Sequence, residues 1–396
     1  MSKINISEAI DSISTRIITS RYERDGKKGW LSFDTDDHRH PGSKIDIQSS
    51  PGVYSGRLGV AIYLAAVEST EGDWSPPQME TETLFNDLGP TNIQSYTQNL
   101  GLGIEDGVGS VVYGLSLLSE LTGDEQHSET AQAVARTLSH QQIKSAEVTN
   151  VLSGLAGAIH GLCKLYETDA SDVGLTRAIR CGERLLEFQY PKWGTTAIDT
   201  HPGSVTTCST GMGRGAAGVA HALYRLYGHT GRTEFRDAAD DVLVFERAFY
   251  EPSRHNWLAN WNDVPNFRLW WSQGTPGIGL ARIGSLDEHS ADLLRDDLSC
   301  AAGYTPRISE RDSLCHGTFS QVSFLIELSR YHGESCDDAR QLAARAIRRR
   351  QSEQGYRLVG AVPKANPSLF LGLAGIGYTL LRLSAPNQLP SIGRLE

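Results

Sequence analysis

The stretch Cys315-His-Gly-Thr-Phe-Ser-Gln-Val-Ser-Phe-Leu325 joins a small-residue turn to an apolar helix, and this pairing decides the fold. Gly317 permits the turn, and the apolar residues from Phe319 to Tyr331 predict the helix. A helix that is apolar nearly all round must be buried on all sides. The stretch therefore predicts one buried helix that begins at a glycine turn.

The same pairing returns six more times along the chain, roughly 40 to 60 residues apart, which is the range in which each repeat is one supersecondary unit. The other copies begin at Ser55, Glu105, Leu152, Gly211, Trp271 and Leu371. Between the copies lie more polar, amphipathic helical stretches, among them Ser128 to His140, Leu175 to Phe188, Thr233 to Phe249 and Asp337 to Arg350. Buried helices ringed by amphipathic ones predict an all-α protein, an α/α toroid of about seven inner and seven outer helices.

The domain organisation follows from the repeats. Residues 1–50 are expected to form an N-terminal helix, Ser7 to Arg21, and a polar loop that packs on the toroid, and residues 51–396 a single toroidal domain. With 396 residues, 39% of them hydrophobic, the chain is long enough to bury a sizeable core.

Charge and composition limit the classes of binding partner and the cellular compartment that we expect for this protein. A net charge of -10 excludes the basic footprint of a nucleic-acid-binding protein, and no basic run indicates an anionic membrane. The N-terminus lacks the apolar core of a signal peptide, so we expect a cytoplasmic protein. The six cysteines follow no regular framework, so in a reducing compartment they are expected to be free thiols or ligands.

Cys315 and His316 form half of a candidate zinc site. Adjacent Cys and His side chains reach one ion only from a turn or a helix end, and Gly317 provides such a turn. The competing interpretation is ordinary packing, because a free cysteine behaves as a small buried hydrophobe.

Four motifs resemble those of the lanthionine synthetase C-like (LanC-like) cyclases. They are Trp-x-x-Gly-x-Pro-Gly-Ile at 271–278, Leu-Cys-His-Gly at 314–317, Gly-x-x-x-Gly-Ala-Ala-Gly at 211–218 and Gly-Leu-Ala-Gly-Ile-Gly-Tyr at 372–378. The likeness covers about residues 5 to 396 and is closest to the C-terminal cyclase domain of class II lanthipeptide synthetases. The chain has a cyclase's length, without room for the dehydratase domain that precedes the cyclase in those synthetases.

The resemblance implies a reaction. Members of the family bind zinc through Cys, Cys and His at the mouth of the toroid, and a Cys thiol of a precursor peptide takes the open position. Zinc lowers the pKa of that thiol, so that a thiolate attacks dehydroalanine or dehydrobutyrine and a thioether ring forms. An acid/base histidine and an aspartate assist proton delivery to the resulting enolate. The implied partners are the precursor peptide and, as a candidate, a separate dehydratase.

This sequence departs from the family pattern at three positions. The first zinc cysteine is replaced by Ser272, the acid/base histidine by Arg214 and the aspartate by Asn150. A serine hydroxyl is a poor zinc ligand, and an arginine stays protonated and cannot act as a base. The resemblance thus leaves Cys315, His316 and the degenerate Ser272 as metal positions, and Arg214, Asn150, Cys315 and His316 as catalytic positions.

Three hypotheses fit this pattern. In the first, the protein is a thioether-forming cyclase that holds zinc weakly or not at all and acts by positioning its reactants. In the second, it is a noncatalytic scaffold that binds a precursor peptide and partner enzymes. In the third, the cavity hosts a different reaction, with Arg214 as an anion or oxyanion clamp and Cys315 as a nucleophile beside His316.

Other polar and aromatic residues have simpler interpretations. His160 and His221 lie inside apolar helices and are interpreted as core histidines. His201 and Cys208 flank a loop from which either could supply a replacement zinc ligand. The tryptophans before the fifth repeat are interpreted as core, with a peptide groove as the alternative; these are Trp257, Trp261, Trp270 and Trp271.

Overall fold

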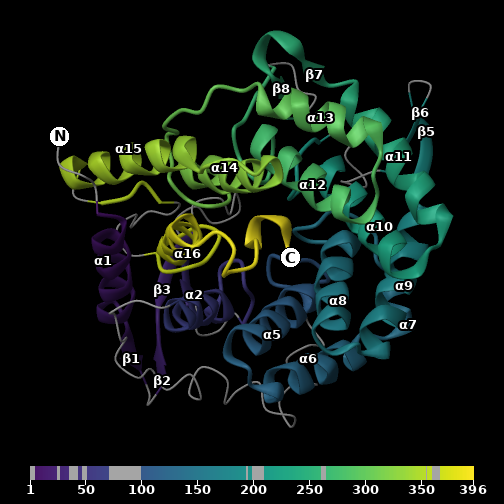
Figure 1. Cartoon of the computed structure of the whole chain (residues 1–396). Helices are drawn as coiled ribbons and strands as arrows, with labels where there is room; N and C mark the ends of the chain where they lie inside the picture. Colours follow the sequence, from purple (N-terminus) through teal and green to yellow (C-terminus); the bar gives the residue numbers. More distant parts are fainter. Residues whose placement is uncertain are drawn as a thin grey trace.

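Seven apolar helices form the inner ring of the protein. A computed structural model describes residues 5–24, 27–34, 43–46, 51–70, 100–192, 195–198, 209–259, 265–353, 355–358 and 366–396. The inner helices are α2 (Arg57–Ser69), α5 (Val108–Thr122), α8 (Leu155–Asp169), α10 (Ala216–Thr230), α12 (Thr275–Glu288), α14 (Thr318–His332) and α16 (Leu373–Ser384). Each packs on the next, and α16 packs on α2, so the ring closes (Figure 1). The predicted all-α toroid is confirmed.

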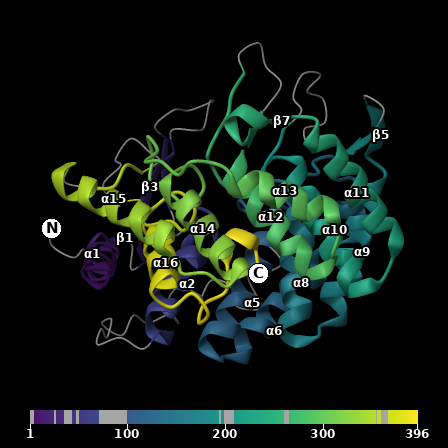
Figure 2. The same ribbon diagram turned by 45° about the horizontal axis from the view of Figure 1, so that its top comes forward.

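Amphipathic helices surround this ring, each packed on an inner helix (Figure 2). They are α1 (Ile6–Thr19), α6 (Glu125–Thr137), α9 (Asp172–Leu186), α11 (Thr233–Arg247), α13 (Asp292–Ala302) and α15 (Asp337–Glu353). A short helix, α7 (His140–Lys144), packs on α9. An outer helix for α2 would fall in residues 71–99, which lie outside the described residues. None of the helices described is long and apolar enough to span a bilayer.

Strands are few and short. Among the described residues, four antiparallel pairs form, β1 (Tyr22–Arg24) with β2 (Lys27–Gly29), β3 (Leu31–Asp34) with β4 (Ser43–Asp46), β5 (Gln189–Lys192) with β6 (Thr195–Ile198), and β7 (Tyr250–Glu251) with β8 (Asn256–Trp257). The first two pairs lie where a polar loop was expected. The helix expected ahead of that loop forms as α1, where Ser14 Oγ and Tyr63 Oη of α2 are 2.6 Å apart. A domain boundary at residue 50 stays a prediction.

Each inner helix begins after a glycine that serves as its N-cap. These glycines are Gly56, Gly107, Gly154, Gly215, Gly274, Gly317 and Gly372. At Gly274, φ is +96° and an added Cβ would lie 1.9 Å from the carbonyl oxygen of Arg268. The glycines therefore let the turn fold back against its own helix, which offsets their low helix propensity.

The turns ahead of the inner helices are joined into a ring by hydrogen bonds. Most of these bonds run between backbone groups, and the last runs from the Val53 amide to the Ser110 hydroxyl at 2.8 Å. In order around the ring, the donor and acceptor residues are Ile104 to Val151, Leu152 to Gly213, Gly213 to Ser272, Trp271 to Cys315, Cys315 to Phe370 and Phe370 to Tyr54. Residues about fifty positions apart are thereby fixed side by side at one mouth of the toroid.

The other side of the ring is filled by the segment around the 3-10 helix η3 (Ile392–Arg394), which lies near the centre in both views (Figures 1 and 2). Trp271 Nε1 donates to the Gly393 carbonyl at 2.8 Å, His221 Nε2 to that of Arg394 at 3.0 Å and Arg225 Nη1 to that of Leu395 at 2.7 Å.

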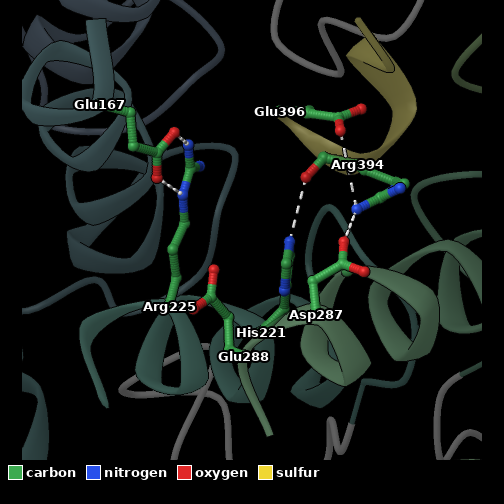
Figure 3. A pocket seen from close by; sticks show the side chains of 8 residues that line it. Glu167, His221, Arg225, Asp287, Glu288, Arg394 and Glu396 are labelled. Carbon is green, nitrogen blue, oxygen red and sulfur yellow. Dashed lines mark hydrogen bonds and ion pairs between the residues drawn. The ribbon is translucent and has the colours of Figure 1, made fainter. Parts of the chain in front are cut away.

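A charged cavity of about 140 Å³ remains beside this segment. Arg225 pairs with Glu167 across it, and Arg394 with Asp287 (Figure 3). The segment thus fills the toroid on the side away from the ring of turns.

Candidate functional site

Cys315 and His316 lie in the turn ahead of α14, at the ring of turns. The Cys315 side chain is fully buried, and its Sγ lies 3.7 Å from Nε2 of His316. Tyr54, which precedes α2, donates its hydroxyl to the same sulfur at 2.9 Å. The adjacent thiol and imidazole therefore point to one place, and their role as metal ligands stays a prediction.

Burial determines the protonation state of this thiol. It raises the pKa of Cys315 to about 12, and the hydrogen bonds with Tyr54 and Ser272 and the positive charge of Arg214 offset it only in part. At neutral pH the side chain is therefore a neutral thiol. A buried, neutral thiol is a poor nucleophile.

Ser272 stands where the family pattern calls for a second zinc thiolate. Its side chain is buried, its amide donates to the Cys315 carbonyl at 3.3 Å, and it helps to offset the rise that burial causes in the pKa of the Cys315 thiol. The two turns are thus in the register that would let both side chains meet one ion, but the second donor is a hydroxyl.

The residues present fit half of a zinc site. Sulfur and nitrogen ligands of a tetrahedral zinc ion lie about 3.6 Å apart at ordinary bond lengths, close to the 3.7 Å between Cys315 Sγ and His316 Nε2. A catalytic zinc ion takes three protein ligands, however. In the part of the chain that the structure describes, no three His, Cys, Asp or Glu side chains gather to hold a metal ion. His201 and Cys208, the two candidate replacements, lie outside it.

Arg214 lies at the same mouth. It sits in the turn, one residue ahead of the N-cap Gly215, rather than in the first turn of α10 as expected. Its side chain is 44% exposed, and its Nη2 lies 3.9 Å from Oε1 of Glu105. An ion pair this long and exposed contributes little to stability. Burial raises the pKa of the Tyr54 hydroxyl and of the Cys315 thiol, and the positive charge of Arg214 offsets a part of each rise.

Asn150 has a structural role in its own turn. It is buried, its Oδ1 accepts from the Ser153 amide at 3.0 Å, and its carbonyl accepts from the Gly154 amide at 3.0 Å. These bonds shape the turn that leads into α8. An amide oxygen accepts such a bond as well as a carboxylate does, without titrating.

Two residues of this site, Tyr54 and Glu105, are not apparent from the motifs. Both precede an N-cap glycine by two positions, as do Ser272 and Cys315. Alignment of the repeats on that glycine brings these four side chains to one position of the repeat. That register is the signal that would have found them.

A groove of about 530 Å³ adjoins His316. Trp270 lines it and meets the imidazole edge to face, with ring centroids 5.0 Å apart. Trp257 and Trp271 are fully buried, as the core interpretation predicted. Trp261 lies outside the described residues.

Comparisons with known proteins agree with this architecture. The family model "Lanthionine synthetase C-like protein" matches residues 48–393. Nisin cyclase has a similar fold, with a TM-score of 0.66 and 14% identity over 99% of this chain and 98% of that one. The unsaturated glucuronyl hydrolase of Bacillus sp. GL1 is a more distant match, with a TM-score of 0.49 and 13% identity over 84% of this chain and 97% of that one. No curated protein sequence matches the chain.

Proposed function

The chain belongs to the lanthionine synthetase C-like protein family, and we propose that it is a peptide cyclase that forms thioether rings. Its substrate is a precursor peptide in which Cys thiols add to dehydroalanine or dehydrobutyrine. A separate dehydratase makes those residues, and both enzymes act in the cytoplasm.

The observation that carries this proposal is the meeting of Cys315, His316 and Ser272 at the mouth of the toroid, in the register of a zinc site. Arg214 lies at the same mouth, with its guanidinium partly exposed. Because the second thiolate is missing, zinc is held weakly or is absent, and the chain's own side chains carry the reaction.

In the proposed reaction the peptide thiol loses its proton, the α-carbon of the alkene gains one, and a C–S bond forms at the β-carbon. His316 accepts the proton of the peptide thiol, since imidazole is the side chain that ordinarily exchanges protons near neutral pH. The sulfur lone pair forms the C–S bond at the β-carbon, and the double-bond electrons move onto the carbonyl oxygen. Arg214 stabilises that enolate electrostatically, water donates a proton to the α-carbon, and the hydroxide that remains takes the proton from His316. Placing thiol and alkene together in one site supplies the rest of the acceleration.

The hypothesis that Cys315 is itself the nucleophile receives less support. Its side chain is fully buried and its pKa lies near 12, so almost none of it is thiolate at neutral pH. The thiol that reacts is therefore better supplied by the substrate.

The test uses a dehydrated peptide with one Cys and one dehydroalanine. Cyclisation leaves the mass unchanged, so it is followed as loss of alkylation by N-ethylmaleimide in mass spectra, with lanthionine identified after hydrolysis. We expect the protein to accelerate ring closure over buffer, and His316→Asn to remove most of the acceleration. Binding of the peptide without acceleration would contradict the proposal and favour a noncatalytic scaffold.

A further inference from the structure

The groove beside His316 runs between two segments of the chain. Residues 267–270 precede α12 and form one side, and residues 307–311 precede α14 and form the other. Its volume of about 530 Å³ is that of a site for a ligand the size of a short peptide. His316 is one of the residues that line the groove, so the groove adjoins the candidate site.

The groove is positively charged on a protein that is negative overall. Arg268, Arg307 and Arg311 line it against a single glutamate, Glu310, whereas the whole chain carries a net charge of -10. The Arg307 side chain is exposed and forms no hydrogen bond or ion pair with the residues that the structure describes. Cationic side chains held in a concave site raise the local concentration of anionic ligands.

Aromatic rings make up the rest of the recognition surface. Phe267 and Trp270 line the same side as Arg268, whose guanidinium carbon lies 4.3 Å from the Trp270 ring centroid. Within the described part of the chain, the buried Nε of Arg268 has no hydrogen-bond partner. The stacking holds the guanidinium in place, and its other nitrogens can bind an anion without giving up a protein partner.

The side formed by residues 307–311 is rigid because buried side chains hold its backbone. Gln321 of α14, fully buried, accepts from the Arg307 amide at 3.1 Å and donates to the Arg307 carbonyl at 2.8 Å. The Ser309 amide donates to Thr318 Oγ1 at 3.1 Å. A surface fixed in this way loses little conformational entropy when a ligand binds.

We propose that this groove binds an acidic segment of the precursor peptide and so delivers the reacting residues to His316. The inference rests on the proposed function for the identity of the peptide, but the binding chemistry belongs to the groove itself. Carboxylates of the peptide pair with Arg268 and Arg307, and its apolar side chains pack on Phe267 and Trp270. A peptide is favoured over a nucleic acid because the surrounding protein is acidic.

The test measures binding without chemistry. The probe is a fluorescein-labelled peptide rich in Asp and Glu, with interspersed Leu and without Cys or dehydroamino acids; the comparison peptide carries Asn and Gln instead. Fluorescence anisotropy at low ionic strength should show binding of the acidic peptide, weakened by added salt, and much weaker binding of the amide peptide. Equal binding of both peptides would overturn the proposal.

The variants Arg307→Glu and Arg268→Glu should each weaken binding about tenfold or more, because each places a like charge opposite the peptide. The matched control is Arg340→Glu on α15, an exposed residue that does not line the groove, which should bind as the unmodified protein does. If a charge reversal impairs folding, Arg307→Gln and Arg268→Gln replace these variants in the same binding measurement, because they remove the positive charge without adding a negative one. Groove variants that bind like Arg340→Glu would contradict the proposal.

Two further outcomes separate this proposal from others. An oligonucleotide that binds as tightly as the acidic peptide, and is lost in the same variants, would replace the peptide by nucleic acid and overturn the inference. Specific peptide binding in a protein that never accelerates ring closure leaves the groove in place and contradicts the proposed function. If the protein accelerates ring closure but the groove variants bind the acidic peptide as the unmodified protein does, the proposed function stands and the groove proposal is contradicted.

Discussion

Ser272 and Cys315 lie side by side, joined by a hydrogen bond from the Ser272 amide to the Cys315 carbonyl, where the family pattern calls for two thiolates on one metal ion. We predict that the unmodified protein retains less than one zinc ion per chain and that Ser272→Cys raises the occupancy towards one, because it supplies the missing soft ligand. Metal content after dialysis, measured by elemental analysis, checks this. Ser299→Cys on α13 makes the same chemical change at an exposed site and should leave occupancy unchanged. One tightly held zinc ion in the unmodified protein would contradict the prediction.

Arg214 offers a second test at the scale of one residue. Its ion pair with Glu105 is long and partly exposed, so Arg214→Gln should change stability by less than about 1 kcal/mol. Loss of the charge that stabilises the enolate should nevertheless slow ring closure by roughly a hundredfold. Melting temperature and the alkylation assay separate the two effects. Glu105→Gln is the matched control, because it breaks the same pair and keeps the cation. A variant with a lower melting temperature and an unchanged rate would assign Arg214 a structural role only.

At the scale of the element, each repeat determines how its turn packs against the helix as well as the helix itself. Three residues after the N-cap stands a Gly or Ser that packs against the carbonyl of the preceding turn. An alanine at Gly218 would place its Cβ 1.9 Å from the Met212 carbonyl oxygen. Because that contact is backbone, the turn itself must move.

We therefore predict that Gly218→Ala lowers the free energy of unfolding by about 3 kcal/mol. Gly231→Ala is the control: that residue has φ of +66° and open space around it, so it should cost only about 1 to 2 kcal/mol. Urea unfolding followed by circular dichroism measures both. If Gly218→Ala lowers the free energy of unfolding by less than Gly231→Ala does, the turn moves at little cost to make room for the added Cβ, and the prediction is wrong.

The helices could be predicted because each carries its own signal. The apolar run after Gly317 is sufficient to predict α14, and the same holds for the other six inner helices. The bonds between turns could not be predicted, since the Trp271 amide and the Cys315 carbonyl are backbone groups without a sequence signature. The motifs identified Cys315 and His316, whereas Tyr54 and Glu105 belong to no motif and share with Cys315 only their position two residues ahead of an N-cap glycine.

At the scale of the whole molecule, the plug around η3 depends on neutral histidines. Its residues carry no repeat pattern, so nothing in the sequence predicted where they lie. His221 Nε2 donates to the Arg394 carbonyl, and its ring lies 4.8 Å from that of His160. Burial first, and then nearby Arg225, lowers the pKa of His221 to about 3, and burial also lowers that of His160.

These shifts predict a loss of stability in mild acid. A histidine ordinarily titrates near 6.5, so between about pH 6.5 and pH 3 the unfolded chain binds protons at His221 that the folded chain does not. Stability is fully present above that window and is lost as the pH falls through it, by up to about 1.4 kcal/mol per pH unit for each such histidine. Glu167, whose pKa the Arg225 guanidinium and a hydrogen bond with His229 lower despite burial, adds a similar loss below its ordinary range.

His221→Gln should flatten this dependence, because an amide can still donate to the Arg394 carbonyl but does not titrate. The measurement is the urea midpoint between pH 7.5 and pH 4.5, values that bracket the ordinary histidine range of about 6.5. His332→Gln, at the exposed end of α14, should keep the slope of the unmodified protein. If His221→Gln and His332→Gln have the same slope, His221 titrates alike in both states, and the plug does not hold it neutral.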